Sequence, residues 1–396
     1  MLTAVLPRSQ RARVLTAGYL LDSTATGMYL AVATLYFVAY LGVPAASVGI
    51  ALAVANVCGL LVPMPVARLT ERLGVARVYV TLLVLRGVGM AAYVLAADFW
   101  RYLLVTCLFT TASRAALPLL QVLVGQIESE DDRTRAMASL RTVNNVGLGA
   151  GFLLAAGVQL LHSRAAYLVL FAVGGLAFGA VAAVTAAATR GLTVGAAPGR
   201  ARPGRTVYLD GRFLALAAAN AVLLLHDSLL FILIPLWVVQ RSGLSPTLSS
   251  VLLLLNTVLT VLLQVYVARF AKGVGGSLRL LRWSVAALLA AGLLLGLADG
   301  GARWTLVTLL AAAVALLTVG ENLHSVAGWE LSFLLSDPDR RAQYLSLFSL
   351  GYTAQLIVGP VLVTSVVLPL GMPGLLLVLV LFVVAAAVTT VAARRP

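Results

Sequence analysis

The stretch Val66-Ala67-Arg68-Leu69-Thr70-Glu71-Arg72-Leu73-Gly74 lies between two long apolar runs and has a counterpart 201 residues later. In that counterpart, Val267-Ala268-Arg269-Phe270-Ala271-Lys272-Gly273-Val274-Gly275, the opening Val, Ala and Arg and the final Gly recur in register. The same offset relates two further pairs of positions, Gly42 with Gly243 and Tyr36 with Trp237. A chain that repeats itself at half its length is predicted to contain two copies of one structural unit.

The composition is that of a membrane protein. Hydrophobic residues make up 61% of the 396 positions and charged residues 11%, whereas soluble domains contain about 25% charged residues. Cys58 and Cys107 both fall inside apolar runs, so they predict neither a disulfide nor a metal site. The first apolar run follows Arg8, Arg11 and Arg13 without a small-residue cleavage site, which indicates an uncleaved first span.

Twelve apolar runs are long enough to cross a bilayer, because a helix of about 20 residues spans roughly 30 Å of hydrocarbon. The first six lie at 14–40, 46–67, 75–97, 102–126, 136–161 and 166–188. The second six lie at 213–239, 246–268, 277–298, 304–330, 345–369 and 373–393. The predicted fold class is therefore an all-α polytopic membrane protein with twelve transmembrane helices in two six-helix repeats.

A polar stretch at 189–212, rich in Gly, Pro and Arg, separates the two sets. Its composition predicts a cytoplasmic linker, so the expected domains are six-helix bundles at 1–188 and 213–396. A second repeated stretch supports the duplication, because 131–136 (Asp-Asp-Arg-Thr-Arg-Ala) is similar to 337–342 (Asp-Pro-Asp-Arg-Arg-Ala). Two halves of six helices in the same direction are the arrangement expected of a rocking transporter.

The placement of positive charge predicts the orientation. With the N-terminus in the cytoplasm, the even-numbered loops, the adjoining span ends and both termini hold 22 of the 28 Lys and Arg residues, and the outer loops hold four. This asymmetry favours cytoplasmic termini. The net charge of +14 is thus spread along one membrane face, where anionic lipid and not nucleic acid is the expected partner. Arginine outnumbers lysine 27 to 1, which is typical of a GC-rich genome and favours a bacterial plasma membrane protein.

The stretch at 66–74 also carries a pattern of its own: Leu69, Glu71, Arg72 and Gly74. The pattern, together with the span count and the repeat, resembles the major facilitator superfamily, in particular its twelve-helix drug–proton antiporters. The family's loop 2–3 signature reads Gly-x-Leu-Ala-Asp-Arg-x-Gly-Arg-Lys, of which the leading Gly and the two trailing cations are not matched in place.

The resemblance implies that this loop closes the cytoplasmic gate, with its acid facing a helix terminus and nearby arginines. A carboxylate near the positive end of a helix is stabilised and is released when two halves rock apart. The alternative is a solvated turn on the cytoplasmic side. The residues assigned to the gate are Arg68, Glu71, Arg72, Gly74 and Arg77.

Span five contains Asn145-Val146-Gly147-Leu148-Gly149-Ala150-Gly151, which is similar to the glycine-rich motif of the family's drug–proton antiporters but lacks its closing Gly-Pro. Small residues allow helices to approach closely, so the packing role is retained while the missing proline weakens the antiport assignment. A Gly359-Pro360 pair in span eleven is expected to serve either as a packing kink or in gating.

Ionisable side chains inside the apolar runs are the best indicators of a functional site, because a charge in hydrocarbon costs several kcal/mol unless it is paired or faces water. In span one, Asp22 is followed at helical spacing by Thr26, Tyr29, Ala33 and Tyr36, a stripe suited to a cavity wall. Asp22 is the first candidate for a proton- or cation-linked carboxylate. The alternative is a salt bridge that only holds helices together.

Three arginines differ in their expected relation to Asp22. Arg114, near the middle of span four, needs a carboxylate or an anionic substrate group, and a pair with Asp22 could be broken by protonation. Arg141, at the start of span five, is the alternative partner. Arg86 is expected to extend its side chain towards the interface, because the resemblance places span three on the periphery. Asn145 is expected to hydrogen-bond either a substrate or a neighbouring helix.

In the second half, span seven carries Asn220, His226 and Asp227, and span ten carries Glu321 and His324. The resemblance implies that spans one, four, seven and ten line a central cavity, and each holds an ionisable residue. The alternative is structural pairing of the two acids with the two histidines. The predicted proton-coupling and cavity residues are Asp22, Arg114, Asp227, Glu321, Tyr29, Asn145 and His324.

The predicted function is secondary active transport by alternating access, with proton-coupled efflux of a small hydrophobic or drug-like compound as the leading hypothesis. The alternatives are a proton-coupled importer or uniporter of a small metabolite and, from other classes, a membrane receptor or enzyme. The sequence contains no Walker-type phosphate loop, and no cofactor or metal is expected. The histidines at 162, 226 and 324 do not have ligand spacing, so an enzyme is not expected. One chain contains both halves, so a monomer is expected to function.

Overall fold

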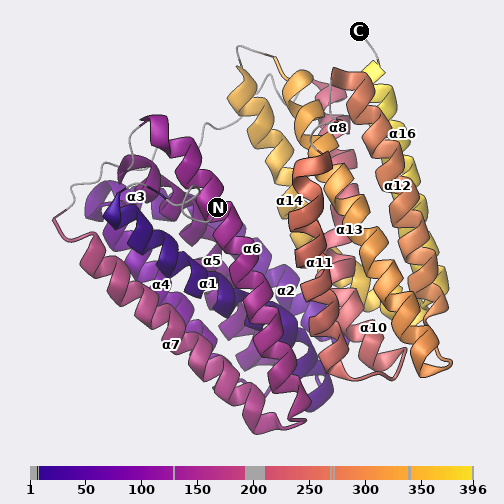
Figure 1. The fold of residues 1–396 in the computed structure, drawn as a ribbon, viewed down its shortest axis with the longest axis horizontal. Helices are drawn as coiled ribbons and strands as arrows, with labels where there is room; N and C mark the ends of the chain where they lie inside the picture. The colour runs from indigo at the N-terminus through magenta and orange to yellow at the C-terminus, as the bar shows by residue number, and fades with distance from the viewer. Residues whose placement is uncertain are drawn as a thin grey trace. The chain divides into compact units, whose positions relative to one another are not determined.

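The computed structural model describes residues 7, 9–127, 130–191, 210–267, 270, 273–337 and 340–394. Within these ranges it describes the backbone alone at 63, 64, 67, 125, 126, 130, 131, 133–135, 138, 264, 265, 342 and 394. The described part of the chain is helical and has no strand, and it divides into two compact units, Met1–Gly199 and Arg200–Pro396 (Figure 1). Most of the predicted linker lies outside the described residues.

In the first unit, all six predicted spans are helical. The helices are α1 (Gln10–Leu35) with the π-helical turn η2 (Tyr36–Tyr40), α2 (Ala45–Leu61), α3 (Pro63–Leu73), α4 (Val75–Ala92) with the short 3-10 turn η3 (Tyr93–Leu95), α5 (Phe99–Ile127), α6 (Glu130–Leu160) and α7 (Arg164–Ala188). Helix α1 packs against α6 and α7, α4 against α5 and α7, and α2 against α5. Figure 1 shows α1, α4 and α7 side by side.

The second unit repeats the plan. Its helices are α8 (Gly211–Leu223), α9 (Leu225–Ser228), the π-helical stretch η5 (Leu229–Leu233), α10 (Ile234–Gln240), α11 (Pro246–Val267), α12 (Gly273–Leu297), α13 (Arg303–Leu334), α14 (Arg341–Leu362), the π-helical stretch η8 (Val363–Val367), α15 (Leu368–Leu370) and α16 (Met372–Arg394). Predicted span seven is thus built from α8, α9, η5 and α10, and predicted span eleven from α14, η8 and α15.

The predicted membrane class is confirmed. Ten helical stretches of the described chain are long and apolar enough to cross a membrane, and Ala45–Leu61 is a shorter apolar helix. Together with α1, they occupy all twelve predicted spans. The second predicted run, 46–67, extends too far, because helix α2 ends at Leu61 and a new helix begins at Pro63. Proline favours this first helical position, where its missing N–H is not needed.

The sequence repeat is visible in the backbone of the first loop of each unit. Gly42 and Gly243 have φ values of 67° and 62°, a region that favours glycine. The Val43 N–H donates to Phe37 O (3.0 Å), and the Leu244 N–H donates to Val238 O (2.8 Å), again 201 residues apart. The repeat therefore reproduces a helix end as well as a hydrophobic pattern.

The repeat shifts at the next loop. Gly74 has a φ of 83° and ends α3, whereas its counterpart by sequence, Gly275, lies inside α12. In the corresponding loop of the second unit, the positive φ belongs to Gly273, at 65°. Residues 268, 269, 271 and 272 lie outside the described part.

Glycines bring α1 and α6 into backbone contact. A Cβ on Gly147 would come within 2.8 Å of Leu20 O, and one on Gly151 within 2.7 Å of the Met28 backbone nitrogen. From the other side, a Cβ on Gly27 would come within 2.6 Å of Leu148 O. No side chain fits at these positions without moving a helix, so the close approach expected of the span five glycines is confirmed for Gly147 and Gly151.

Candidate functional site

The carboxylate of Asp22 is held inside the first unit by an arginine on α4. Asp22 is 3% exposed and Arg86 is 6% exposed. Arg86 donates from Nη1 to Asp22 Oδ2 and from Nη2 to Thr26 Oγ1 (3.0 Å). Its guanidinium carbon lies 4.3 Å from the ring centroid of Phe178 on α7, a cation–π distance. The Asp22–Arg86 pair is therefore buried, its charges compensate each other, and the ring of Phe178 packs against the guanidinium.

The expectation that Arg86 reaches the interface is wrong because α4 packs tightly against α7. A Cβ on Gly87 would lie 2.9 Å from Gly175 O, so the two helices touch and enclose the residue before Gly87. The expected partners of Asp22 are wrong as well. Arg141 is exposed, and Arg114 bonds elsewhere.

Arg114 lies between α5 and α2. Its Nη2 donates to Asn56 Oδ1 (2.6 Å), and Asn56 in turn donates from Nδ2 to Leu52 O (2.8 Å). A Cβ on Gly59 would come 2.9 Å from Arg114 Cγ, so this glycine makes room for the arginine stem. Arg114 is half-buried and keeps its positive charge beside a neutral amide.

The aromatic stripe expected on a cavity wall is instead packed inside the first unit. Tyr29 is 8% exposed, and its hydroxyl lies 3.1 Å from the hydroxyl of Tyr93. The ring of Tyr29 lies 4.5 Å from that of Phe109, and Tyr36, 1% exposed, lies 5.6 Å from Tyr167. These rings pack α1 and η2 against α5 and α7, and the cavity-wall placement of Tyr29 stays a prediction.

Asn144 on α6, and not the predicted Asn145, forms hydrogen bonds to α1. Tyr19 Oη donates to Asn144 Oδ1 (2.9 Å), and Ser23 Oγ donates to the same oxygen (3.3 Å). Asn145 is half-buried, and no side-chain hydrogen bond joins it to the described part of the chain. Asn144 thus has the helix-bonding role that the sequence left open for Asn145.

In the second unit, four predicted polar residues meet between α8, α9 and α13. His324 Nε2 lies 3.1 Å from Asn220 Oδ1, and His324 Nδ1 lies 3.1 Å from His226 Nε2. His226 Nδ1 lies 3.1 Å from Asp227 Oδ1. His226 and His324 are 1% and 2% exposed, while the Asp227 side chain is 22% exposed. Asp227 therefore pairs with His226, which agrees with the structural alternative for this acid.

Glu321 takes a different partner from the one considered. Its Oε2 accepts from Asn256 Nδ2 on α11 (2.9 Å), and Asn256 also donates to Thr318 Oγ1 (3.0 Å). Glu321 and Asp227 both lie close enough to His226 to interact with it electrostatically. Two acids and two histidines thus form one cluster of ionisable groups inside the second unit.

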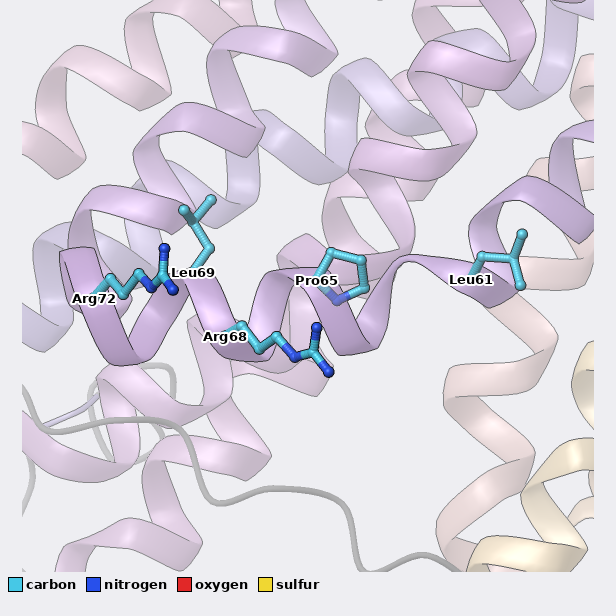
Figure 2. Close-up of a pocket in the computed structure, with 5 residues that line it drawn as sticks. All are labelled: Leu61, Pro65, Arg68, Leu69 and Arg72. Atoms are coloured by element: carbon cyan, nitrogen blue, oxygen red, sulfur yellow. The ribbon is translucent and has the colours of Figure 1, made fainter.

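The predicted gate stretch is a helix and not a turn. In α3, Val66 packs against a buried apolar cluster and Thr70 is buried, whereas Arg68, Glu71 and Arg72 are exposed. The far side of α3 borders a pocket of about 600 Å³, lined by Leu61, Pro65, Arg68, Leu69 and Arg72 (Figure 2). Pro65, Arg68, Leu69 and Arg72 are three or four residues apart on α3 and so share one face of that helix, whereas Leu61 is the last residue of α2. Arg77, early in α4, is exposed too.

The acid of this stretch is solvated. Among the described side chains, none forms an ion pair with Glu71. Gly74 provides the positive φ that ends α3 and admits the chain to α4. An exposed carboxylate between two exposed arginines, on a helix between two spans, is chemically able to bind and release a charged partner.

Together, the two helical units and their membrane-length helices define a polytopic membrane protein. The family model of the Major Facilitator Superfamily matches residues 15–333, so the chain belongs to this family. Among curated proteins, none matches the chain.

Three solved structures illustrate the likeness. A bacterial homologue of the iron transporter ferroportin in an inward-facing state has a TM-score of 0.80 at 14% identity, covering 98% of this chain and 100% of that chain. The nucleoside transporter NupG has a TM-score of 0.75 at 13% identity, covering 97% and 98%. A bacterial homologue of the human lysosomal transporter Spinster has a TM-score of 0.73 at 15% identity, covering 97% and 96%. At such identities the likeness concerns the fold alone, and the narrower drug–proton antiporter assignment stays a prediction.

Sequence reasoning missed Arg86 as the partner of Asp22, and Asn256 as the partner of Glu321. Both residues lie on helices, α4 and α11, that are apolar on most sides, so the sequence pattern does not show which side of the helix faces its neighbours. Arg86 had one usable signal, since a mid-span arginine next to a small residue, Gly87, indicates a tight helix contact.

Proposed function

We propose that the chain is a proton-coupled secondary transporter in which Asp22 is a coupling carboxylate. The buried Asp22–Arg86 pair carries the proposal. Arginine stays protonated in proteins, so a proton arriving at this contact goes to Asp22 and removes the opposite charge that compensates Arg86.

Protonation of Asp22 changes the free energy of this contact by an amount comparable to what is needed to switch a protein between two conformations. Breaking a buried ion pair by neutralising one partner costs about 3–5 kcal/mol. Moving a two-state equilibrium from 1:99 to 99:1 takes about 5.5 kcal/mol. Protonation of Asp22 would therefore displace most of such an equilibrium by itself, through the α1–α4 contact.

The proposed cargo is a small hydrophobic or drug-like compound, and the proposed direction is out of the cell. The glycine-rich segment of α6 supports this, because it packs backbone to backbone against α1, the helix that carries Asp22. The missing proline in Asn145–Gly151 favours the second candidate, a proton-coupled importer or a uniporter of a small metabolite.

The gate role proposed for α3 rests on its exposed charges. Arg68, Glu71 and Arg72 are solvated on a helix that Val66 anchors to the bundle, and Gly74 and Arg77 lead into α4. We place this helix and both termini on the cytoplasmic side of the plasma membrane because basic residues concentrate there. A single chain is proposed as the working unit.

The test is transport into inside-out vesicles, screened across a compound panel with and without an imposed proton gradient. An acidic lumen should drive uptake of at least one compound, and collapse of the gradient should abolish it. Asp22→Asn should lose gradient-driven uptake and keep passive equilibration of the same compound. Gradient-driven uptake at the unmodified rate in Asp22→Asn would eliminate Asp22 as the coupling site. Uptake that is insensitive to the gradient in the unmodified protein would indicate a uniporter.

Two controls separate coupling from folding. Asp98→Asn alters an exposed carboxylate that caps α5 through the Trp100 and Arg101 N–H groups, and should transport normally. The double variant Asp22→Asn/Arg86→Gln removes both charges, and so restores the neutrality of the contact without restoring a proton site. It should fold and still lack gradient-driven uptake.

A further inference from the structure

The line Asn220–His324–His226–Asp227 places hydrogen-bond acceptors at both of its ends. An ionised carboxylate and an amide oxygen can only accept, and a neutral imidazole has one N–H and one accepting nitrogen. Asn220 Oδ1 therefore calls for an N–H at His324 Nε2. The carboxylate of Asp227 calls for an N–H at His226 Nδ1; this contact is electrostatic, since Nδ1 has no aligned acceptor.

These two N–H groups use the single proton of each neutral ring. His226 Nε2 and His324 Nδ1 would then face each other with two lone pairs at 3.1 Å. Two lone pairs at that distance repel, whereas a proton between them gives a hydrogen bond of ordinary length. With an N–H at each outer nitrogen, the pair therefore carries three protons on four ring nitrogens, which is one imidazolium shared by the two rings.

The surrounding charges compensate such a cation. Among the described side chains, the ionisable groups that interact with His226 are Asp227 on α9, and Glu321 and His324 on α13. The other helices packed here contribute neutral groups, namely Asn220 on α8, Asn256 on α11 and Gln355 on α14, which donates to Ser228 Oγ. A buried cation next to two carboxylates satisfies the rule that buried charges are paired.

The backbone at this place is irregular. Predicted span seven breaks at Leu224, continues for four residues as α9 and then turns π-helical from Leu229 to Leu233. Such π-helical interruptions occur frequently at functional sites. Gly328 on α13 leaves space beside the line, because a Cβ there would come 3.1 Å from Asn220 Oδ1. His226 thus lies on a short segment between two breaks, where displacement from α13 disturbs little regular helix.

We infer that His226 and His324 form a proton-binding site that holds one proton between their facing ring nitrogens. With the proton bound, the pair bridges α9 to α13. Without it, the two lone pairs repel and the bridge opens. The role of this site in transport rests on the proposed proton coupling, to which it adds a second proton site in the second unit; binding of the proton does not depend on that proposal.

The test is a count of protons on the histidine rings. The chain has three histidines, and His162 is exposed with a φ of 47°. His162→Asn keeps a residue that tolerates this backbone and leaves only the buried pair. The full chain carrying this change, labelled with 15N-histidine in lipid nanodiscs with EDTA present, is measured by side-chain 1H–15N NMR across pH. His226→Gln in the same background assigns the two rings.

The expected spectrum shows protons on His226 Nδ1 and His324 Nε2 and a third, shared proton on the inner nitrogens. As pH rises, the third proton should leave in one step that shifts both rings together. A spectrum with two protons at every pH and a bare His324 Nε2 would overturn the inference, because it is the pattern of a neutral chain in which the Asn220 amide donates. Independent titration of the two rings would overturn it too.

The vesicle measurement separates this inference from the proposed function. Three protons on the pair, together with transport that ignores the gradient, would contradict the proposed coupling and support the proton site. Gradient-driven transport with two protons on the pair would contradict the proton site and support the coupling through Asp22.

Discussion

Arg86 supplies a constant positive charge where α1 meets α4, because arginine is not deprotonated in proteins. The residue is 6% exposed. Asp22 is consequently the side chain whose charge can vary there. Arg114 differs, because it donates a hydrogen bond to the neutral amide of Asn56. Two arginines in neighbouring spans thus have different chemistry, decided by the side chain each one meets.

At this scale we predict that Arg86→Gln destabilises the protein more than the double variant Asp22→Asn/Arg86→Gln. The single change leaves the Asp22 carboxylate buried without a cation, at a cost of about 3–5 kcal/mol. The double change leaves two neutral amide side chains that can bond each other. Thermal unfolding of the purified protein measures this, and equal melting temperatures for the two variants would contradict the charge argument.

Helix packing in the first unit depends on where glycines fall. Gly27, Gly147 and Gly151 bring the backbones of α1 and α6 together, and Gly87 and Gly175 do the same for α4 and α7. The two contacts fix the position of α1, which bears Asp22, and of α4, which bears Arg86. The ion pair is therefore a consequence of close helix packing as well as of charge.

We predict that Gly151→Leu lowers the melting temperature, because the added side chain meets the Met28 and Gly27 backbone of α1. Overpacking of this kind costs about 1–3 kcal/mol. Gly157, on the same helix, has open space where a Cβ would lie, so Gly157→Ala is the matched control and should leave the melting temperature unchanged or slightly raised. Equal effects of the two changes would show that the α1–α6 contact is not tight.

The whole chain consists of two compact units, Met1–Gly199 and Arg200–Pro396. The duplicated helix ends at Gly42 and Gly243 relate the units to one ancestral plan, yet their polar interiors differ. The first unit buries an aspartate–arginine pair, and the second buries a histidine pair next to two half-buried acids. The repeat thus preserves the first helix end of each unit, whereas the ionisable residues inside the two units differ.

We predict that a protease site inserted between Gly199 and Arg200 is cut in inside-out vesicles and protected in right-side-out vesicles. The proposed orientation places this boundary in the cytoplasm, and each unit has its own helical packing, so two membrane-embedded fragments should resist further digestion. Cleavage in right-side-out vesicles only would show that the proposed orientation is inverted. Rapid digestion of either fragment would contradict the proposal that each unit is stable by itself.

Hydropathy and the internal repeat determined the helical class, the twelve spans and the family resemblance, because length and polarity of a run are local properties. The helix at 63–73 was missed because its polar face looked like a loop, although Pro63 is a helix-start residue. The sequence also selected Asp22, His324 and Glu321, since a charge within an apolar run is visible without a fold.

Only the tertiary structure decided which residues pair. Arg86 rather than Arg114 or Arg141 meets Asp22, Asn144 rather than Asn145 bonds α1, and Asn256 meets Glu321. These choices depend on the rotation of each helix about its own axis and on how closely glycines let two helices approach. In a helix that is apolar on nearly every side, the polarity pattern does not specify that rotation, so it is set by packing between segments distant in the chain.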